Sequence, residues 1–122
     1  MDSHDLPLLG LTIGDPAGIG PEIAAKALLA PGLTDHLRLV LLGPDSERPP
    51  GLEDAPDDLS QVKGLAFRAT SAVREPFELG LAQANCGAAA LAALRAGTDL
   101  ALAGEIDGLV TGPVCKLSLI HI

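Results

Sequence analysis

Two short, mostly apolar runs and two weaker segments of the same kind recur along the chain, and three of the four are followed directly by glycine. They span residues 8–13, 37–42, 65–70 and 107–111, and the second (Leu-Arg-Leu-Val-Leu-Leu) is almost continuously apolar. Short apolar runs bounded by turn residues are typical of strands buried on both faces of a parallel sheet. The pattern therefore predicts four strands.

Two stretches between these runs carry a helical pattern. Residues 21–30 open with a proline, which suits a first helical position, and repeat apolar residues at four-residue spacing. An Ala/Leu-rich segment predicts a longer helix over residues 81–103, stopped by Gly104. Four residues are predicted to form the apolar face of this helix: Leu91, Leu94, Thr98 and Ala101.

Strands that alternate with helices predict one domain of the α/β class, with a mainly parallel sheet flanked by helices. Residues 44–63 interrupt the alternation, because they are rich in Pro, Asp, Glu and Gly and show no period. We predict an exposed connection there, with a short helical turn near residues 58–62.

Charge and composition narrow the range of partners. Sixteen acidic residues against eight basic ones give a net charge of −8, which disfavours nucleic acid and anionic membrane surfaces and favours a small-molecule ligand. No basic leader and no apolar run of roughly 18 residues is present, so we expect neither export nor a membrane anchor. The two cysteines form no CxxC motif, and we expect a cytoplasmic protein.

The loop after the first strand is the first candidate site. It spans residues 14–20 and contains Gly14, Asp15, Gly18 and Gly20. Such a loop lets a ligand approach the backbone closely and directs helix N–H groups at an anion. It lacks both the GxGxxG spacing and the lysine of a P-loop, so a purely structural tight turn remains the alternative. Asp15 could act in acid–base or metal chemistry, or could be an ordinary turn residue.

The loop after the last strand is the second candidate site. Ligands of open α/β sheets bind at the carboxyl ends of the strands, so residues 111–116, with Thr111, Gly112 and Lys116, are expected to share one cleft with residues 14–20. Lys116 could supply a point charge for a phosphate or carboxylate, or could simply be solvated. The three histidines show no ligand-like spacing, and we expect no metal site from this chain alone.

The residues of both loops resemble those of one enzyme family. Residues 14–22 (Gly-Asp-Pro-Ala-Gly-Ile-Gly-Pro-Glu) closely resemble the opening motif of the 4-hydroxythreonine-4-phosphate dehydrogenase family, whose fold is similar to that of isocitrate and isopropylmalate dehydrogenases. Residues 110–116 (Val-Thr-Gly-Pro-Val-Cys-Lys) are similar to its second block, and residues 85–87 and 103–108 also fit its pattern. The resemblance implies that residues 1–116 are the N-terminal portion of such a dehydrogenase, with an incomplete fold.

This resemblance implies a homodimeric cytoplasmic oxidoreductase of pyridoxine and pyridoxal phosphate biosynthesis. Its substrate would be 4-hydroxythreonine 4-phosphate, a small phosphorylated hydroxy acid. Its cofactors would be NAD or NADP and a divalent metal such as zinc, magnesium or cobalt. The family's three metal-binding histidines and its substrate-gripping His-Thr pair fall beyond Lys116, so the chain is expected to be inactive alone. Two alternatives stay open: a fragment of a dehydrogenase for threonate or erythronate phosphate, and a non-catalytic α/β fragment that binds at most an anion.

The resemblance breaks off after Lys116. Residues 117–122 (Leu-Ser-Leu-Ile-His-Ile) match the translation of a widely used transposase adapter end, and we predict that they are not native protein. They would then be exposed or loosely docked, and His121 would have no role as a ligand. The alternative is a genuine strand or the start of a helix.

Overall fold

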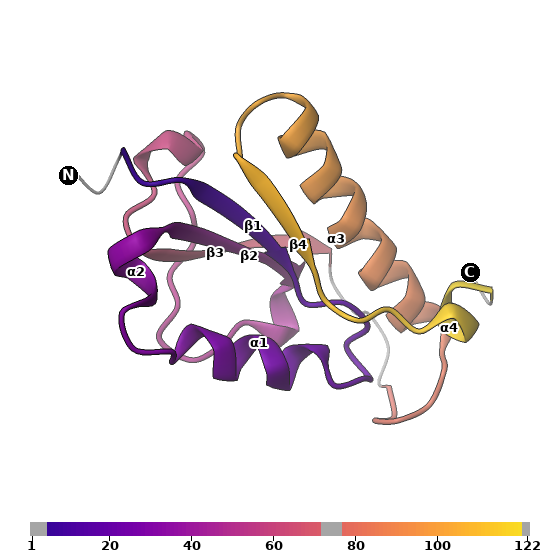
Figure 1. The fold of residues 1–122 in the computed structure, drawn as a ribbon. Coiled ribbons are helices and arrows are strands. Elements are labelled where there is room, and N and C mark those ends of the chain that lie inside the picture. The colour runs from indigo at the N-terminus through magenta and orange to yellow at the C-terminus, as the bar shows by residue number, and fades with distance from the viewer. Residues whose placement is uncertain (1–4, 72–76, 121–122) are drawn as a thin grey trace.

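Four parallel strands form the sheet at the centre of the fold. The computed structural model describes residues 5–71 and 77–120. The strands are β1 (Leu8–Thr12), β2 (Arg38–Pro44), β3 (Leu65–Ser71) and β4 (Gly108–Thr111). They are paired in the order β3-β2-β1-β4 (Figure 1). The predicted strands and the predicted α/β class are confirmed.

The helices are α1 (Gly20–Leu28), α2 (Leu33–His36), α3 (Ala84–Leu102) and α4 (Lys116–Ile120). Helices α1 and α3 confirm the two predicted ones. Helix α3 begins three residues later than predicted, because Gly80 has a φ of 81° and Gln83 has an extended backbone. Helix α2 was not predicted, since four residues are too few to show a helical period.

Side chains of the strands alternate between two cores, one on each face of the sheet. Val40 and Leu42 pack with Ala93 of α3. Leu39 and Leu41 lie in the other cluster, with Ala24 of α1. The two helices therefore cover opposite faces of the sheet, and the carboxyl ends of its strands all point to one edge.

The predicted apolar face of α3 is wrong. Thr98 and Ala101 are exposed, and Leu91 and Leu94 are only partly buried. The buried face consists instead of mostly small residues: Cys86, Gly87, Ala89, Ala90, Ala93, Gly97 and Leu100. Small residues let the helix lie close to the sheet, and a Cβ on Gly97 would be only 2.6 Å from Cδ1 of Leu109. Close packing, rather than side-chain hydrophobicity, selects this face.

The acidic connection is less exposed than predicted. Leu59 and Val62 are buried in the core on the α3 face, and residues 59–61 form the helical turn predicted near 58–62. Phe67 of the edge strand β3 donates its N–H to the carbonyl of Glu53 (2.8 Å) and accepts from the N–H of Ala55 (2.7 Å). The connection therefore covers the outer edge of the sheet, which would otherwise present unpaired backbone groups to solvent.

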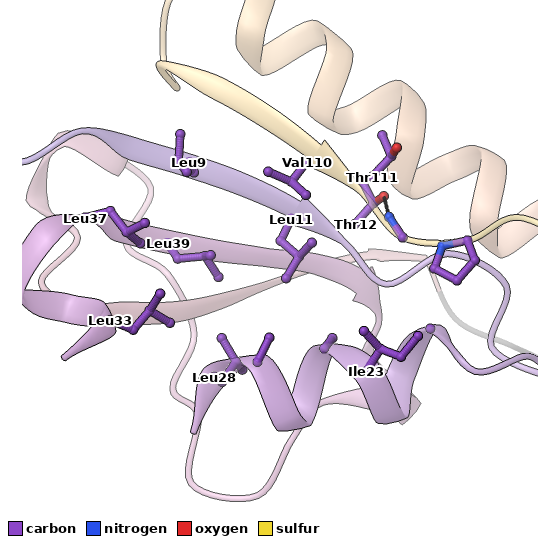
Figure 2. Close-up of a pocket in the computed structure, with 15 residues that line it drawn as sticks. Leu9, Leu11, Thr12, Ile23, Leu28, Leu33, Leu37, Leu39, Val110 and Thr111 are labelled. Carbon is purple, nitrogen blue, oxygen red and sulfur yellow. Dashed lines mark hydrogen bonds between the residues drawn. The ribbon is translucent and has the colours of Figure 1, made fainter. Parts of the chain in front are cut away.

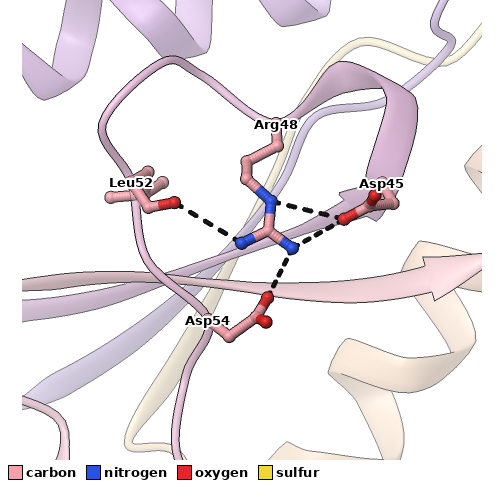
Figure 3. A network of polar contacts seen from close by, with 4 residues as sticks. All are labelled: Asp45, Arg48, Leu52 and Asp54. Carbon is pink, nitrogen blue, oxygen red and sulfur yellow. Dashed lines mark hydrogen bonds and ion pairs between the residues drawn. The ribbon is translucent and has the colours of Figure 1, made fainter.

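Arg48 holds this connection in place (Figure 3). Its guanidinium donates to Asp45 Oδ1 (2.6 Å) and pairs with Asp54. The same group lies 4.9 Å from the ring centre of Phe67, in a cation–π contact. Two of the acidic side chains in this connection, Asp45 and Asp54, are therefore paired with Arg48.

Helix α4 contains the first residues of the predicted non-native tail. Ser118 is fully buried against the start of α3 and accepts a hydrogen bond from the Gln83 N–H (3.1 Å). Leu117 and Ile120 are 59% and 73% exposed, so the expectation of an exposed tail holds for them and is wrong for Ser118. Gly87 permits this docking, because a Cβ there would overlap the Ser118 carbonyl. The non-native origin of the tail stays a prediction, and residues 121–122 lie outside the described part.

Within residues 5–71 and 77–120, no helix combines the length and apolar character that a bilayer crossing requires.

Candidate functional site

The two candidate loops meet at the carboxyl edge of the sheet. They follow β1 and β4, which are adjacent parallel strands. Asp15 donates its N–H to the carbonyl of Pro113 (3.0 Å), and Gly112 donates to the carbonyl of Thr12 (2.7 Å). The prediction that both loops lie at the same edge is confirmed.

Three glycines of these loops are required by close packing. Gly14 has a φ of 78°, which disfavours any side chain. A Cβ on Gly14 would overlap the Pro113 carbonyl, one on Gly20 would overlap the Ile13 carbonyl, and one on Gly112 would overlap backbone atoms of residues 12 and 13. Close backbone packing is therefore sufficient to explain why glycine is present at positions 14, 20 and 112, without a role in ligand binding.

Asp15 and Gly18 are placed differently from these glycines. Asp15 is 3% exposed, and its Oδ1 accepts a hydrogen bond from the Ala17 N–H (2.9 Å), which tightens the turn. Gly18 is exposed. Both residues line a small pocket of about 100 Å³ together with Cys115 of the second loop. Both candidate loops therefore contribute to the wall of this small pocket.

A larger apolar groove of about 350 Å³ lies between α1 and the sheet (Figure 2). Its floor is formed by side chains of β1, β2 and β4, among them Leu11, Leu39 and Val110, and Ile23 of α1 lines its opposite wall. Gly20, Thr111 and Gly112 lie at its end. No sequence feature indicated this groove, because its leucines have the same pattern as core residues.

The remaining charged candidates are on the surface. Lys116 is the exposed first residue of α4 and lines none of the described pockets. Glu22 forms an exposed ion pair with Lys26 across one helical turn (3.1 Å). An exposed pair of this kind adds little stability, so Glu22 has an ordinary structural explanation.

Comparison with known proteins points to one group of enzymes. No family model matches the chain. It is 37% identical over 128 residues to the 4-hydroxythreonine-4-phosphate dehydrogenase of Synechocystis sp. (strain PCC 6803), covering 95% of this chain and 35% of that protein. It is 31% identical over 125 residues to the D-threonate 4-phosphate dehydrogenase of Pectobacterium atrosepticum, covering 92% of this chain and 38% of that protein.

A solved structure of the same kind of enzyme shares the fold. The crystal structure of 4-hydroxythreonine-4-phosphate dehydrogenase from Klebsiella pneumoniae superposes with a TM-score of 0.77 at 27% identity, covering 95% of this chain and 39% of that one. The predicted resemblance to the 4-hydroxythreonine-4-phosphate dehydrogenase family is confirmed. The chain spans less than two fifths of the length of the two curated relatives named above.

The two cysteines of this dehydrogenase-like chain differ in their surroundings. Burial raises the pKa of the Cys86 thiol, and the nearby Asp15 charge adds to that shift. Hydrogen bonds from the backbone and side chain of Ser118 lower the pKa of Cys115, which is partly exposed. Cys86 is therefore an ordinary small buried thiol, whereas the surroundings of Cys115 favour its thiolate form.

The described residues do not provide ligands for the metal that the dehydrogenase family implies. Among residues 5–71 and 77–120, no group of three or more His, Cys, Asp or Glu side chains is close enough to hold an ion. His36 is exposed at the end of α2, and His4 and His121 lie outside the described residues. The part of the chain that is described offers no catalytic metal centre.

Proposed function

We propose that this chain is part of an NAD-dependent, metal-dependent dehydrogenase that oxidises 4-hydroxythreonine 4-phosphate in pyridoxal phosphate synthesis. The observation that carries this proposal is the similarity to such dehydrogenases along nearly the whole chain. The meeting of both motif loops at the carboxyl edge of the sheet supports it, because ligands of open α/β sheets bind there. The longer enzyme would be a cytoplasmic homodimer.

The contribution of this chain would be one wall of the active-site cleft. Thr111 and Gly112 lie at the end of the apolar groove, beside Gly20 at the start of α1. Lys116 lies five residues beyond Thr111 and is exposed at the start of α4. Its ammonium group would attract the phosphate of the substrate as a point charge.

Neither cofactor can be assigned to residues of this chain. The described residues lack a metal-ligand set, and the loop sequence lacks the usual dinucleotide spacing. We therefore place the metal ligands outside this chain and attribute no reaction step to its residues through either group. Their proposed part in the reaction is to shape the cleft and bind the substrate.

A second substrate is supported by one specific observation. The Pectobacterium relative is named for D-threonate 4-phosphate, and its identity to this chain is only six percentage points lower (37% against 31%). The two compounds share a phosphate and a hydroxyl group, so the same cleft wall would serve either one, or erythronate phosphate. A non-catalytic, anion-binding fragment is the remaining alternative.

The deciding experiment measures NADH formation by the longer protein encoded by the intact gene. Each phosphorylated substrate would be supplied with NAD and a divalent metal, and the 122-residue chain would be assayed in parallel. We expect turnover by the longer protein, fastest with 4-hydroxythreonine 4-phosphate, and none by the chain alone. Faster turnover of D-threonate 4-phosphate would reassign the substrate, and turnover by the isolated chain would contradict our placement of the metal ligands.

A charge-removing variant of the longer protein tests the proposed cleft wall. Lys116→Ala should raise the KM about tenfold or more, because a charge-assisted contact to phosphate would be lost. Lys26→Ala is the matched control, since Lys26 is exposed and pairs only with Glu22 among the described ion pairs. Equal KM values for the two variants would remove Lys116 from the site.

A further inference from the structure

The apolar groove between α1 and the sheet is only half covered (Figure 2). Val110 of β4 and Ile23 of α1 line it and are 49% and 48% exposed. The two faces of β1 differ in the same way. Leu8 is 2% exposed in the core with α3, whereas Leu9 and Leu11 line the groove and are only partly buried. Within the described residues, the groove is therefore sheet surface without its cover.

The lining of the groove fits an apolar partner. The described residues that line it carry no charged side chain, and their only hydroxyl groups are those of Thr12 and Thr111. The Thr12 hydroxyl already accepts a hydrogen bond from the Gly112 N–H (3.2 Å). A charged metabolite would lose its hydration in this groove without gaining a counter-charge. The lining suits instead the apolar stripe of an amphipathic helix.

The outer edge of β4 is a second uncovered surface. The connection covers the outer edge of β3, through the hydrogen bonds of Phe67. Among the described strands, β4 pairs with β1 alone, so its outer edge is bare. Native sheets usually cover or block such edges. The groove and the bare edge both lie at β4, so one region of protein can cover them together.

The rest of a longer chain is the most suitable cover. The chain matches 35% of the Synechocystis protein and 39% of the Klebsiella structure, so more than three fifths of each lies outside the matched part. A second copy of the chain is less suitable. A twofold interface centred on the groove would place two concave surfaces face to face, and neither would fill the other.

The handedness of the crossovers indicates which part of a longer chain can reach the groove. From β1 to β2 and from β3 to β4, the chain crosses the sheet in opposite directions. Right-handed crossovers then place α1 and α3 on opposite faces, as observed. A crossover from β4 to a strand on its free side would run in the same direction as that from β3 to β4, so its helix would lie on the face of α3. A helix on the face of α1 must come from a later part of the chain, which returns toward β4.

We infer that, in the longer protein, an amphipathic helix from beyond the first crossover after β4 packs into the groove, against α1 and β1. This inference rests on the proposed function, in which the chain is the N-terminal portion of a longer dehydrogenase. A strand–helix–strand unit takes about 30 residues, so the helix should begin more than about 30 residues after Lys116. Its apolar stripe would bury Ile23 and Val110.

Photo-cross-linking of the longer protein tests the inference. Val110→p-benzoylphenylalanine places a light-activated group on the floor of the groove. Leu102→p-benzoylphenylalanine is the matched control, because it places the same group at the exposed end of α3, outside the groove. Mass spectrometry identifies the captured peptides. We expect the Val110 variant to capture a peptide of its own chain from more than about 30 residues after Lys116, and the Leu102 variant not to capture it.

Four other results would each overturn the inference: a covalent dimer, which would place a second copy in the groove; a captured peptide closer to Lys116; the same peptide from both variants; or no product. NADH formation by the unmodified protein, measured in parallel, separates this inference from the proposed function. An inactive protein that gives the expected peptide supports the inference and contradicts the proposed function. An active protein that gives a covalent dimer does the reverse.

A measurement on the wild-type longer protein covers the case in which the bulky group prevents folding. Hydroxyl radicals oxidise aliphatic side chains in proportion to their access to solvent, and each rate is compared with that of the urea-unfolded protein. An open groove would leave Ile23 and Val110 at about half of their unfolded rates, as their exposures of 48% and 49% imply. The inference requires rates several-fold lower at both residues. A rate near one half at either residue would overturn it.

Discussion

At the scale of single residues, the glycines at positive φ fall into two groups. Gly14 and Gly51 have nearly the same φ, 78° and 82°. A Cβ on Gly51 would meet no atom within 4 Å, whereas one on Gly14 would overlap the Pro113 carbonyl. Both positions disfavour a side chain because of their own backbone. Only Gly14 also needs the space that a side chain would take from its neighbours.

Alanine at these two positions separates the two effects. Gly51→Ala should cost about 1–2 kcal/mol of unfolding free energy, the usual penalty for a left-handed backbone. Gly14→Ala should cost about 3 kcal/mol or more, because the two loops at the carboxyl edge must also move apart. Urea unfolding followed by circular dichroism would measure both. Similar losses would show that the contact between the loops is dispensable.

The sequence located these residues without revealing what they do. Three glycines between a strand and a helix correctly indicated a close approach of backbone at residues 14–20. The sequence does not distinguish a glycine that leaves space for a ligand from one that leaves space for another loop. Only the structure shows that Pro113 occupies the space beside Gly14. The burial of Asp15 was equally invisible, since aspartate before proline is common in exposed turns.

At the scale of elements, strands were easier to predict than the orientation of helices. A strand buried on both faces is apolar at nearly every position, so β2 is recognisable from its composition alone. The sequence predicted the position of helix α3 along the chain correctly but assigned the wrong face of the helix to the sheet. Leucine is more apolar than alanine or glycine, so the face with leucines was expected to be buried. The small residues pack against the sheet instead, because they let the axis of α3 lie close to it. Hydrophobic periodicity carries no information about that distance.

Enlarging one side chain on each face of α3 tests this orientation. Ala93→Leu should destabilise the chain by about 1–3 kcal/mol, because Ala93 is fully buried against the sheet and the added volume overpacks the core. Ala101→Leu places the same atoms on the exposed face and should change the stability by less than about 0.5 kcal/mol. A larger loss from the Ala101 variant would mean that the predicted face, and not the observed one, contacts the sheet.

At the scale of the whole molecule, the two faces of the sheet are covered unequally. Helix α3 has 19 residues and covers one face, whereas α1 has nine and leaves the apolar groove beside β4. Val110 on the floor of this groove and Ile23 on the wall opposite it are 49% and 48% exposed. A contiguous apolar surface of this kind can bind a ligand, because the ligand buries several side chains at once, whereas isolated exposed leucines cannot do this.

The groove should bind an apolar fluorescent dye such as anilinonaphthalene sulfonate. Val110→Ser removes part of its floor and should lower the dye affinity several-fold, since each buried methylene contributes about 0.8 kcal/mol. Leu102→Ser is the matched control, because Leu102 is 83% exposed at the end of α3 and does not line the groove. A fluorescence titration measures both affinities. Equal loss of binding in the two variants would place the dye elsewhere.

The strand order β3-β2-β1-β4 also determines when each strand can pair with its neighbours while the chain is synthesised on the ribosome. Strand β1 emerges first and can pair with β2 after about 30 residues, but its other neighbour, β4, is about 100 residues away in sequence. Until residue 108 has been synthesised, one edge of β1 therefore has no partner. The unpaired backbone groups along this edge of β1 are then open to strands of other nascent chains, so a pause before residue 108 would favour misassembly over folding.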